Sequence, residues 1–508
     1  MRGGAFVLAA LLALAPAARA ENCGTVVLPP NTDITSFNGE FASSVANQRA
    51  FGLMFEQLIW VGAGARIDWS RSLASAITSP DQGTTYDVTL RPWVWSDGKP
   101  VTSADVLYAW KLIQELGTTY PGYGEGGMPD LIKSVTAQDA THFQVVLKHQ
   151  VNPTWFIYDG LSQLQPLPAQ DWSRYTLNQL WQLQSTPSFF KVVDGPLQVQ
   201  SFAPGLDAVF VPNPEYPGPK MQFNRLVFSF AEGDGAKLQQ IEAGSLDMTP
   251  LPTEFWGAVQ HLRGIRIVEL QPQPSWDDLV VNFKNPKVAF FRDVRVRQAM
   301  ADSQDQKRFI RLVLHGLGYG VRAPVTPANI AFEAPSLQQG QYPVGYDPAK
   351  ARELLKQAGF TPGPDGILQK DGKKLSFTML EPSGSAEGDE MVQVIQADFL
   401  HVGIQMKIHE VEFNQALALM NTTGAAFNLG HYSDAKMDRL IADSVDKPGL
   451  DALYAYEIYA SEQQPVIFGA SPAPALLVRD RLHGVKGFYD PGGYDPSKLY
   501  CAAEGADS

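Results

Sequence analysis

Hydrophobic and polar positions along the chain form short runs with two different periods. Some runs alternate residue by residue, which is typical of half-buried strands, and others repeat every three to four residues, which is typical of helices. Strands are expected at residues 143–147, 226–230, 279–283, 376–380 and 405–409, and helices at residues 237–244, 294–301, 348–358, 391–402 and 434–443. Because the two kinds alternate from one end of the chain to the other, the pattern predicts lobes of mixed α/β class.

Residues 86–106 contain a strand, a turn and a helix start in close succession. The sequence Ser-Asp-Gly-Lys at 96–99 has the composition of a β-turn. Thr102 followed by Asp105 has the spacing of a capping box, which marks the start of a helix. A helix is therefore expected over residues 103–116, and the two tryptophans before the turn are expected to anchor it on the first lobe.

The first residues of the chain have the pattern of an export signal. Arg2 precedes an apolar run, and Ala18-Arg19-Ala20 places small residues where cleavage requires them. The apolar run is shorter than a membrane span, and Cys23 lies too far from the cleavage site to carry a lipid. We expect residues 1–20 to be a signal peptide, and the mature protein to be periplasmic without a lipid anchor or stable membrane insertion.

The charge of the chain narrows the choice of partners. Removal of residues 1–20 deletes two arginines and no acid, so the formal charge changes from −13 to −15. A surface with this excess of acids repels phosphate groups. The charge therefore argues against nucleic acid and anionic membranes as partners.

Length and cysteines indicate how the chain is divided. A chain of 508 residues is too long for a single core, so at least two lobes are expected. The polar, proline-containing residues 271–275 are the best candidate for a crossover between them. Cys23 and Cys501 either form a disulfide that joins the two ends or stay as two structural thiols. If they bond, both ends belong to one lobe, and the chain crosses back around residues 465–479.

Catalytic motifs are weak in this sequence. Residues 122–127 match G-x-G-x-x-G, but prolines on both sides replace the strand and helix that nucleotide binding requires, so we expect a glycine loop. No G-x-S-x-G occurs, and His409-Glu410 lacks the second histidine of a zinc motif. We therefore expect a protein that is not an enzyme and that uses neither a cofactor nor a metal.

Several blocks of the mature chain resemble family 5 of the periplasmic solute-binding proteins, which includes dipeptide, oligopeptide and nickel receptors of ABC importers. The strand, turn and helix start at residues 86–106 resemble the best-known signature of that family. Further similar blocks are found at residues 129–147, 194–197, 211–216, 243–247, 282–283, 292–299 and 346–351. Their order along the chain, which is also that of the family, makes the resemblance specific.

This resemblance implies an α/β fold of two lobes, a class II clamshell of the periplasmic-binding-protein type, in which lobe I carries an extra subdomain. Lobe I would comprise residues 21–270 and 480–508, and lobe II residues 271–479. The lobes would close around a small polar or peptide-like solute, which is then delivered to the permease of an ABC importer. The receptor is expected to be a monomer.

The sequence departs from the peptide-binding members of the family at two places. Between residues 412 and 434 it lacks the acidic segment that holds the amino group of a peptide, and residues 381–385 stand where dipeptide binders place an arginine. A bidentate arginine is hard to replace, so a free dipeptide is disfavoured as the ligand. The shortened segment would leave Asn428 and His431 exposed to the cleft.

Aromatic and polar side chains near the expected lobe boundary are the candidates for ligand binding. They are Phe37, Asn38, Glu254, Trp256, Trp276, Asn428 and His431. Trp276 is favoured because it follows the expected crossover, and ligands bind in clefts between lobes. Three alternatives stay open: a degenerate or non-transport binding protein of the same fold, a secreted hydrolase, and a metal-chelate receptor that uses His409 and His431.

Overall fold

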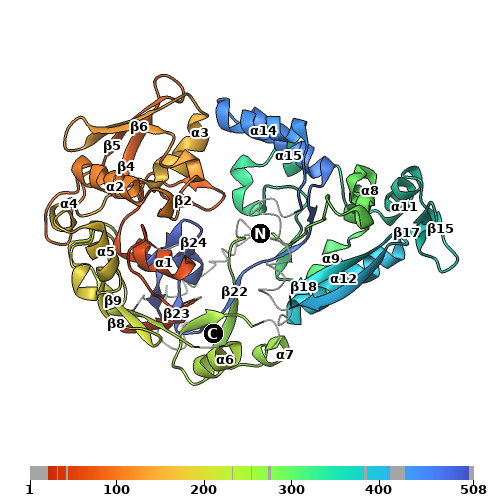
Figure 1. Cartoon of the computed structure of the whole chain (residues 1–508). Coiled ribbons are helices and arrows are strands. Elements are labelled where there is room, and N and C mark those ends of the chain that lie inside the picture. Colours follow the sequence, from red (N-terminus) through yellow and green to blue (C-terminus); the bar gives the residue numbers. More distant parts are fainter. Residues whose placement is uncertain are drawn as a thin grey trace, which may run out of the picture.

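The chain folds into two bodies that lie side by side (Figure 1). The computed structural model describes residues 21–30, 32–41, 44–231, 233–252, 255–272, 276–382, 386–411 and 430–502. Each body has a buried hydrophobic core of its own. We call the first body lobe I, with elements β1 to β12 and β22 to β26, and the second body lobe II, with elements β13 to β21 and the helices between them.

Lobe I is built on three larger sheets. One has the order β1-β10-β9-β8, in which β1 is parallel to β10 and the other pairs are antiparallel. A second, antiparallel sheet has the order β4-β5-β7-β6, and a third has the order β11-β22-β12. The strands are β1 (Thr25–Leu28), β4 (Ala74–Thr78), β5 (Thr85–Leu90), β6 (Ile132–Ala137), β7 (His142–Leu147), β8 (Leu197–Ala203), β9 (Asp207–Pro212), β10 (Arg225–Ser229), β11 (Met248–Pro250), β12 (Ile265–Glu269) and β22 (Ala475–Arg479).

Helices of lobe I are short except for one. They are α1 (Val45–Met54), α2 (Ser103–Leu116), α3 (Pro153–Trp155), α4 (Ala169–Trp172), α5 (Leu177–Leu183), α6 (Asp234–Glu242), α7 (Trp256–Val259) and α16 (Val485–Phe488). The start of α2 confirms the predicted capping box, because the backbone N–H of Thr102 donates to Asp105 Oδ2 over 2.8 Å. The turn before it closes through a hydrogen bond from Trp95 N–H to Lys99 O, and the Trp95 ring is fully buried.

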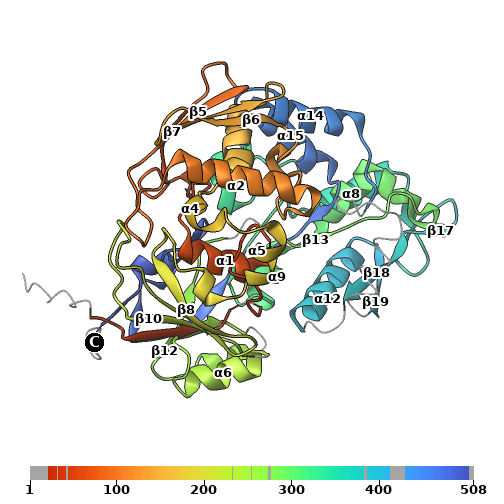
Figure 2. The same cartoon turned by 60° about the vertical axis from the view of Figure 1, so that its left-hand side comes forward.

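Lobe II is centred on a pair of parallel strands with helices around them. Figure 2 shows α12 packed with β18 and β19, well separated from α1 and α5 of lobe I. The strands are β18 (Ser376–Pro382) and β19 (Gln405–Val411). The helices are α8 (Val294–Ser303), α9 (Gln306–Leu312), α10 (Pro335–Gln338), α11 (Pro348–Gln357), α12 (Ala386–His401), α14 (Ala435–Asp446) and α15 (Asp451–Gln463).

Most of the elements expected from the pattern are present, with ends that differ by a few residues. The exception is the strand expected at residues 279–283, which is limited to β13 (Asp278–Leu279). The chain turns after it because Asn282 Oδ1 accepts hydrogen bonds from the N–H groups of Lys284 and Asn285. Residues 122–127 form turns that include η2 (Glu125–Gly127), which confirms the glycine loop.

Two chain segments connect the lobes and lie next to each other. The N–H of Leu270 donates to Pro474 O over 2.7 Å, and the N–H of Asp277 donates to Ser471 Oγ over 2.8 Å. Beyond these contacts, β13 is antiparallel to β20 (Ile467–Phe468). The sequence placed residues 475–479 in lobe II, whereas β22 pairs with β11 and β12 of lobe I. The two connecting segments therefore form a double strand on which lobe II is attached.

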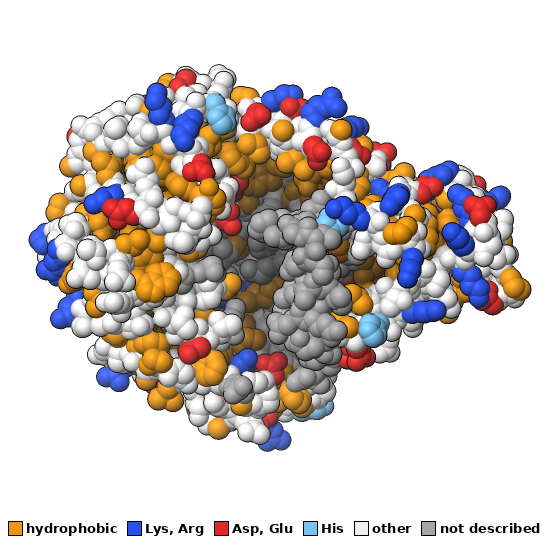
Figure 3. Space-filling model, in the orientation of Figure 1, with side chains coloured by type: hydrophobic (Ala, Val, Ile, Leu, Met, Phe, Trp, Pro, Cys, Tyr) orange, Lys and Arg blue, Asp and Glu red, His pale blue; other side chains and the backbone are white. Residues whose placement is uncertain are grey.

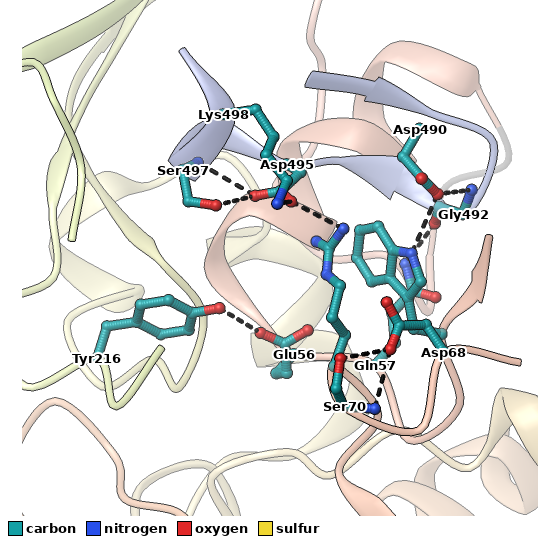
Figure 4. A network of polar contacts seen from close by, with 12 residues as sticks. Glu56, Gln57, Asp68, Ser70, Tyr216, Asp490, Gly492, Asp495, Ser497 and Lys498 are labelled. Atoms are coloured by element: carbon teal, nitrogen blue, oxygen red, sulfur yellow. Dashed lines mark hydrogen bonds and ion pairs between the residues drawn. The ribbon is translucent and has the colours of Figure 1, made fainter. Parts of the chain in front are cut away.

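The two ends of the chain are joined. Cys23 and Cys501 form a disulfide with 5.0 Å between their Cα atoms, which confirms the first of the two alternatives. Beside it, the N–H of Glu21 donates to Cys501 O over 2.7 Å. The C-terminal segment is also fixed to the chain between α1 and β4: Gln57 Nε2 donates to Gly492 O, and Asp495 pairs with Arg71. Figure 4 shows how Gln57, Gly492 and Asp495 lie in this contact.

The blocks that resemble the solute-binding family meet beside this C-terminal segment. Trp93 Nε1 donates to Asp194 O over 2.9 Å, and the N–H of Glu56 donates to Asp194 Oδ1 over 3.0 Å. The Tyr216 hydroxyl donates to Glu56 Oε2 over 3.0 Å (Figure 4). Burial raises the pKa of Glu56 to about 7 although Arg71 and Tyr216 counteract it. These motif residues therefore fix the scaffold of lobe I.

Candidate functional site

A hollow opens between the two lobes. Figure 3 shows it in the middle of this face of the molecule, with hydrophobic side chains at its upper rim and acidic side chains on its wall. Clefts between lobes that are connected by a hinge are the usual place for a small ligand. The side chains that bridge the lobes and those near the double strand are therefore the first candidates for function.

Asn152 bridges the lobes where α3 faces α14 (Figure 1). Its side-chain Nδ2 donates to Ser444 O over 3.0 Å and to Gly449 O over 2.9 Å, both in lobe II. Its Oδ1 accepts from the N–H of Thr154 and so caps α3. Asn152 is buried, and every polar atom of its side chain has a partner. This residue therefore connects the start of α3 directly to the last turn of α14 and to the loop after it.

Aromatic rings also make contact between the lobes. The rings of Tyr158 and Phe332 meet edge to face, with centroids 5.0 Å apart. At the opposite edge, the predicted residue Trp256 stacks on His315 of lobe II, with ring centroids 4.6 Å apart and planes inclined by 6°. α7, which carries Trp256, lies at the lower edge of the molecule in Figure 1. The lobes are thus in contact on both sides of the hollow, and Trp256 is part of one contact.

Trp276 lies beside the double strand, as predicted. Its ring meets Phe468 of β20, with centroids 5.9 Å apart. The next residues, Asp277 and Asp278, border a cavity that extends into lobe II towards α9 and α12. Trp276 therefore lies next to this cavity of lobe II.

The structure places Phe37 and Asn38 inside lobe I. The Phe37 ring is fully buried and meets Phe202 and Phe190, with centroid distances of 5.0 and 5.9 Å. Asn38 is also fully buried, and its Nδ2 has no hydrogen-bond partner. In this arrangement Phe37 serves the core because phenylalanine rings surround it. A role of either residue in binding stays a prediction.

Glu40 was not among the candidates from the sequence. Its side chain is 4% exposed, its Oε2 has no hydrogen-bond partner, and burial raises its pKa to about 8. Glutamate is usually exposed, and nothing in the sequence around Glu40 signals that this one is buried. Two unpartnered polar groups, those of Asn38 and Glu40, therefore lie in the same turn.

His431 lies on a loop that is fixed to lobe II by its neighbours. Gly430 O accepts from the N–H of Phe283 over 2.9 Å, and the Tyr432 ring meets the Phe283 ring with centroids 5.1 Å apart. His431 itself is half-buried. The other two candidates, Glu254 and Asn428, lie outside the described residues.

Acidic groups replace the arginine that dipeptide binders carry after β18. Glu381 is 5% exposed, and burial raises its pKa, with Asp389 and Glu410 acting in the same direction. An acid in this setting repels a carboxylate instead of pairing with it. That a free dipeptide is disfavoured as the ligand stays a prediction.

Metal ligands are not clustered in the part of the chain that the structure describes. No group of three or more histidine, cysteine, aspartate or glutamate side chains there could hold a metal ion. Over the same residues, no helix is both long enough and apolar enough to cross a membrane. What the described hollow offers is hydrogen-bonding groups, aromatic rings and acids, which suit non-covalent binding.

Comparisons with a family model and with individual proteins both point to solute-binding proteins. A model of the bacterial extracellular solute-binding proteins, family 5, matches residues 69–446. The oligopeptide-binding protein AppA of Bacillus subtilis is 24% identical over 514 residues, which cover 92% of this chain and 90% of AppA.

Solved structures show the same fold. AppA from Bacillus subtilis in complex with a nonapeptide superposes with a TM-score of 0.68 at 22% identity, covering 96% of this chain and all 100% of the other. NikZ from Campylobacter jejuni in complex with Ni(L-His) superposes with a TM-score of 0.69 at 19% identity, covering 94% of this chain and 99% of NikZ. Identities this low establish the fold and leave the solute open.

Proposed function

Because the chain belongs to family 5 of the bacterial extracellular solute-binding proteins, we propose that it captures a small polar or peptide-like solute between its lobes and delivers it to the permease of an ABC importer. The observation that carries the proposal is the pair of lobes attached through one double strand, with a hollow between them. Such an attachment allows the lobes to close on a solute that contacts both.

The names of relatives support a receptor for importers. AppA is described as an oligopeptide-binding protein, and a relative in Deinococcus radiodurans, 26% identical over 375 residues that cover 68% of this chain and 61% of the relative, is a probable ABC transporter-binding protein. The acids around Glu381 make this chain differ from a dipeptide receptor. A longer or capped peptide fits the proposal better than a free dipeptide.

The cellular context follows from the sequence. We propose that residues 1–20 are removed as a signal peptide and that the mature protein works in the periplasm as a monomer, without a lipid anchor and without catalysis. We further propose that lobe II spans residues 276–474, because β22 belongs to a sheet of lobe I. Members of the family are binding proteins, which agrees with a receptor that is not an enzyme.

A thermal-shift screen of the purified mature protein tests the proposal. Short peptides, capped peptides, sugars, opines, polyamines and nickel chelates are added separately. A solute at a hundred times its dissociation constant should stabilise the protein by about 2.7 kcal/mol, which raises the Tm measurably. A rise in Tm with a peptide is the expected result. The absence of a shift with every class would contradict a transport receptor and favour a degenerate or non-transport protein of the same fold.

A further inference from the structure

The cavity beside the double strand lies within lobe II. It is bordered by β13, by the start of α9, by α12 and by the segment that follows β20. The cavity has a volume of about 30 Å³ and is partly open to solvent. The space is therefore narrow, and it suits one slender chemical group better than a ring system.

One wall of the cavity is apolar. Leu279, Phe309, Val394, Ile395 and Ile467 contribute to it, and they come from four separate elements of lobe II. An aliphatic group placed here loses contact with water and gains contacts with carbon atoms on several sides. The wall therefore selects for a hydrocarbon group.

One polar group in the wall has no partner. Gln304 is 5% exposed and lines the cavity, and its Nε2 makes no hydrogen bond. Gln306, two residues later, provides the contrast: its Nε2 donates to Val321 O and Phe468 O, and its Oε1 accepts from the N–H of Val321. A buried N–H without an acceptor is costly, so Gln304 offers a donor to any ligand that brings an acceptor.

The charge around the cavity is negative. Asp277, Asp278, Asp305 and Asp398 line it, and none of the described lining residues is Lys, Arg or His. Asp398 is paired with Arg308, but Asp278 has no such ion pair, and burial raises its pKa to about 6 with a further contribution from Asp277. At neutral pH Asp278 is mostly ionised and repels a second anion. The acceptor that reaches Gln304 should therefore be uncharged.

We propose that this cavity takes an uncharged aliphatic group that is bonded to a neutral carbonyl, such as the side chain and capped end of a peptide amide, and that it rejects the matching free carboxylate. The aliphatic group fills the space along Val394 and Ile395, and the carbonyl oxygen accepts from Gln304 Nε2. This assignment rests on the proposed receptor function and names the solute chemistry that the cavity of lobe II accepts.

N-acetyl-L-leucinamide and N-acetyl-L-leucine test this proposal, because they differ only at one end, which is a neutral amide in the first compound and a carboxylate in the second. Their binding to the full mature protein is measured by ligand-observed NMR titration at pH 7.5. The amide should bind at least about tenfold more tightly than the acid, since a neutral acceptor replaces a repelled anion. Equal binding of the two compounds, or tighter binding of the acid, overturns the proposal.

Three variants locate the binding in the cavity. Gln304→Leu should weaken the amide about tenfold by removing the donor. Gln357→Leu makes the same chemical change at an exposed glutamine of α11 and should leave both affinities unchanged. Asp278→Asn should reduce the difference in affinity between the amide and the acid, because it removes the charge that repels the carboxylate. If Gln304→Leu binds both compounds as the wild type does, the assignment of the donor is wrong.

A cavity-filling variant covers the case in which Gln304→Leu folds poorly. Val394→Phe adds a ring at the helix α12 wall and should abolish binding of both compounds while the Tm stays near that of the wild type. Binding that persists in Val394→Phe contradicts the proposal. If neither leucine compound binds while longer peptides raise the Tm, this proposal fails and the receptor proposal stands. If the two leucine compounds behave as expected while no solute class raises the Tm, the cavity proposal stands and the receptor proposal fails.

Discussion

Glu40 shows how one side chain can set the response of the whole fold to pH. Its carboxyl group is buried without a cation beside it, so burial raises its pKa from 4.5 to about 8. The unfolded chain binds fewer protons than the folded chain between these two values. Stability should therefore fall as the pH rises from about 4.5 to about 8 and then level off. Glu56 and Glu457, each with a pKa raised to about 7, act in the same direction.

The variant Glu40→Gln should remove the contribution of this residue. At pH 5 the folded wild type has a neutral Glu40, so the variant and the wild type should unfold at similar denaturant concentrations. At pH 8 the variant should be more stable, by at most about 4 kcal/mol, because each pKa unit corresponds to about 1.4 kcal/mol. Urea unfolding at both pH values measures the difference. Glu353→Gln alters the same charge at an exposed site and should show no such pH dependence.

At the residue scale, scaffold residues were easier to predict than binding residues. Trp93, Asp194 and Tyr216 stand in blocks with local turn or helix signals. Asp194 and Tyr216 both bond to Glu56, and Trp93 donates to Asp194. Gln304 and Glu40 stand in no such block. Their importance depends on burial, which is decided by segments far away in the sequence and cannot be deduced from neighbouring residues.

Helix α3 is the element that most directly connects one lobe to the other. Its capping residue Asn152 donates from the same side chain to two carbonyl groups of lobe II. Each hydrogen bond contributes on the order of 1 kcal/mol. Loss of both should therefore favour separation of the lobes.

The variant Asn152→Ala should weaken solute binding about tenfold, because less of the protein is in the closed form. Titration calorimetry with any solute found by the thermal-shift screen measures the loss, and small-angle scattering should show a larger radius of gyration.

Asn285→Ala is a matched control for this variant. Asn285 also precedes a proline and caps a helical turn, through the N–H of Lys287, but it lies within lobe II. It should lower stability by about 1 kcal/mol and leave affinity unchanged. Equal effects of the two variants on affinity would show that the bridge has no role in closure.

Elements with strong local signals were predicted well, and elements that depend on distant partners were not. The capping box at Thr102 and Asp105 fixed the start of α2, and Asp347 caps α11 by accepting from the N–H groups of Ala349 and Lys350. β13 is shorter than its apolar run suggested because its partner β20 has only two residues. Strand length is set by pairing, which the sequence of one strand does not contain.

For the whole molecule, the fold class could be predicted from the alternation of strands and helices and from the order of motif blocks. The cavity could not be predicted from the sequence. Its wall is assembled from β13, α9, α12 and the segment after β20, which are far apart in the sequence. Only the packing of lobe II brings them together. Both segments of the double strand contain two prolines, but the second segment was placed around residues 465–479 only because a disulfide between the chain ends requires the chain to cross back.

The disulfide gives a prediction at this scale. Cys23 and Cys501 are separated by 478 positions in the sequence, so the bond restricts nearly the entire unfolded chain. Loop entropy gives at most about 5 kcal/mol of stabilisation. The double variant Cys23→Ser, Cys501→Ser should therefore lower the Tm by several degrees and leave solute affinity unchanged. An equal Tm for the oxidised protein, the reduced protein and the double variant would contradict this.

The same bond determines how the protein behaves when it is held by one end. Cys23 and Cys501 both belong to lobe I, and the chain passes to lobe II and back through the double strand. A tether joined to either terminus therefore pulls on lobe I alone, and mechanical load between the termini passes through the disulfide without reaching the hollow. A protein immobilised on a sensor surface through either end should keep lobe II free to move, so that binding measured on the surface equals binding in solution.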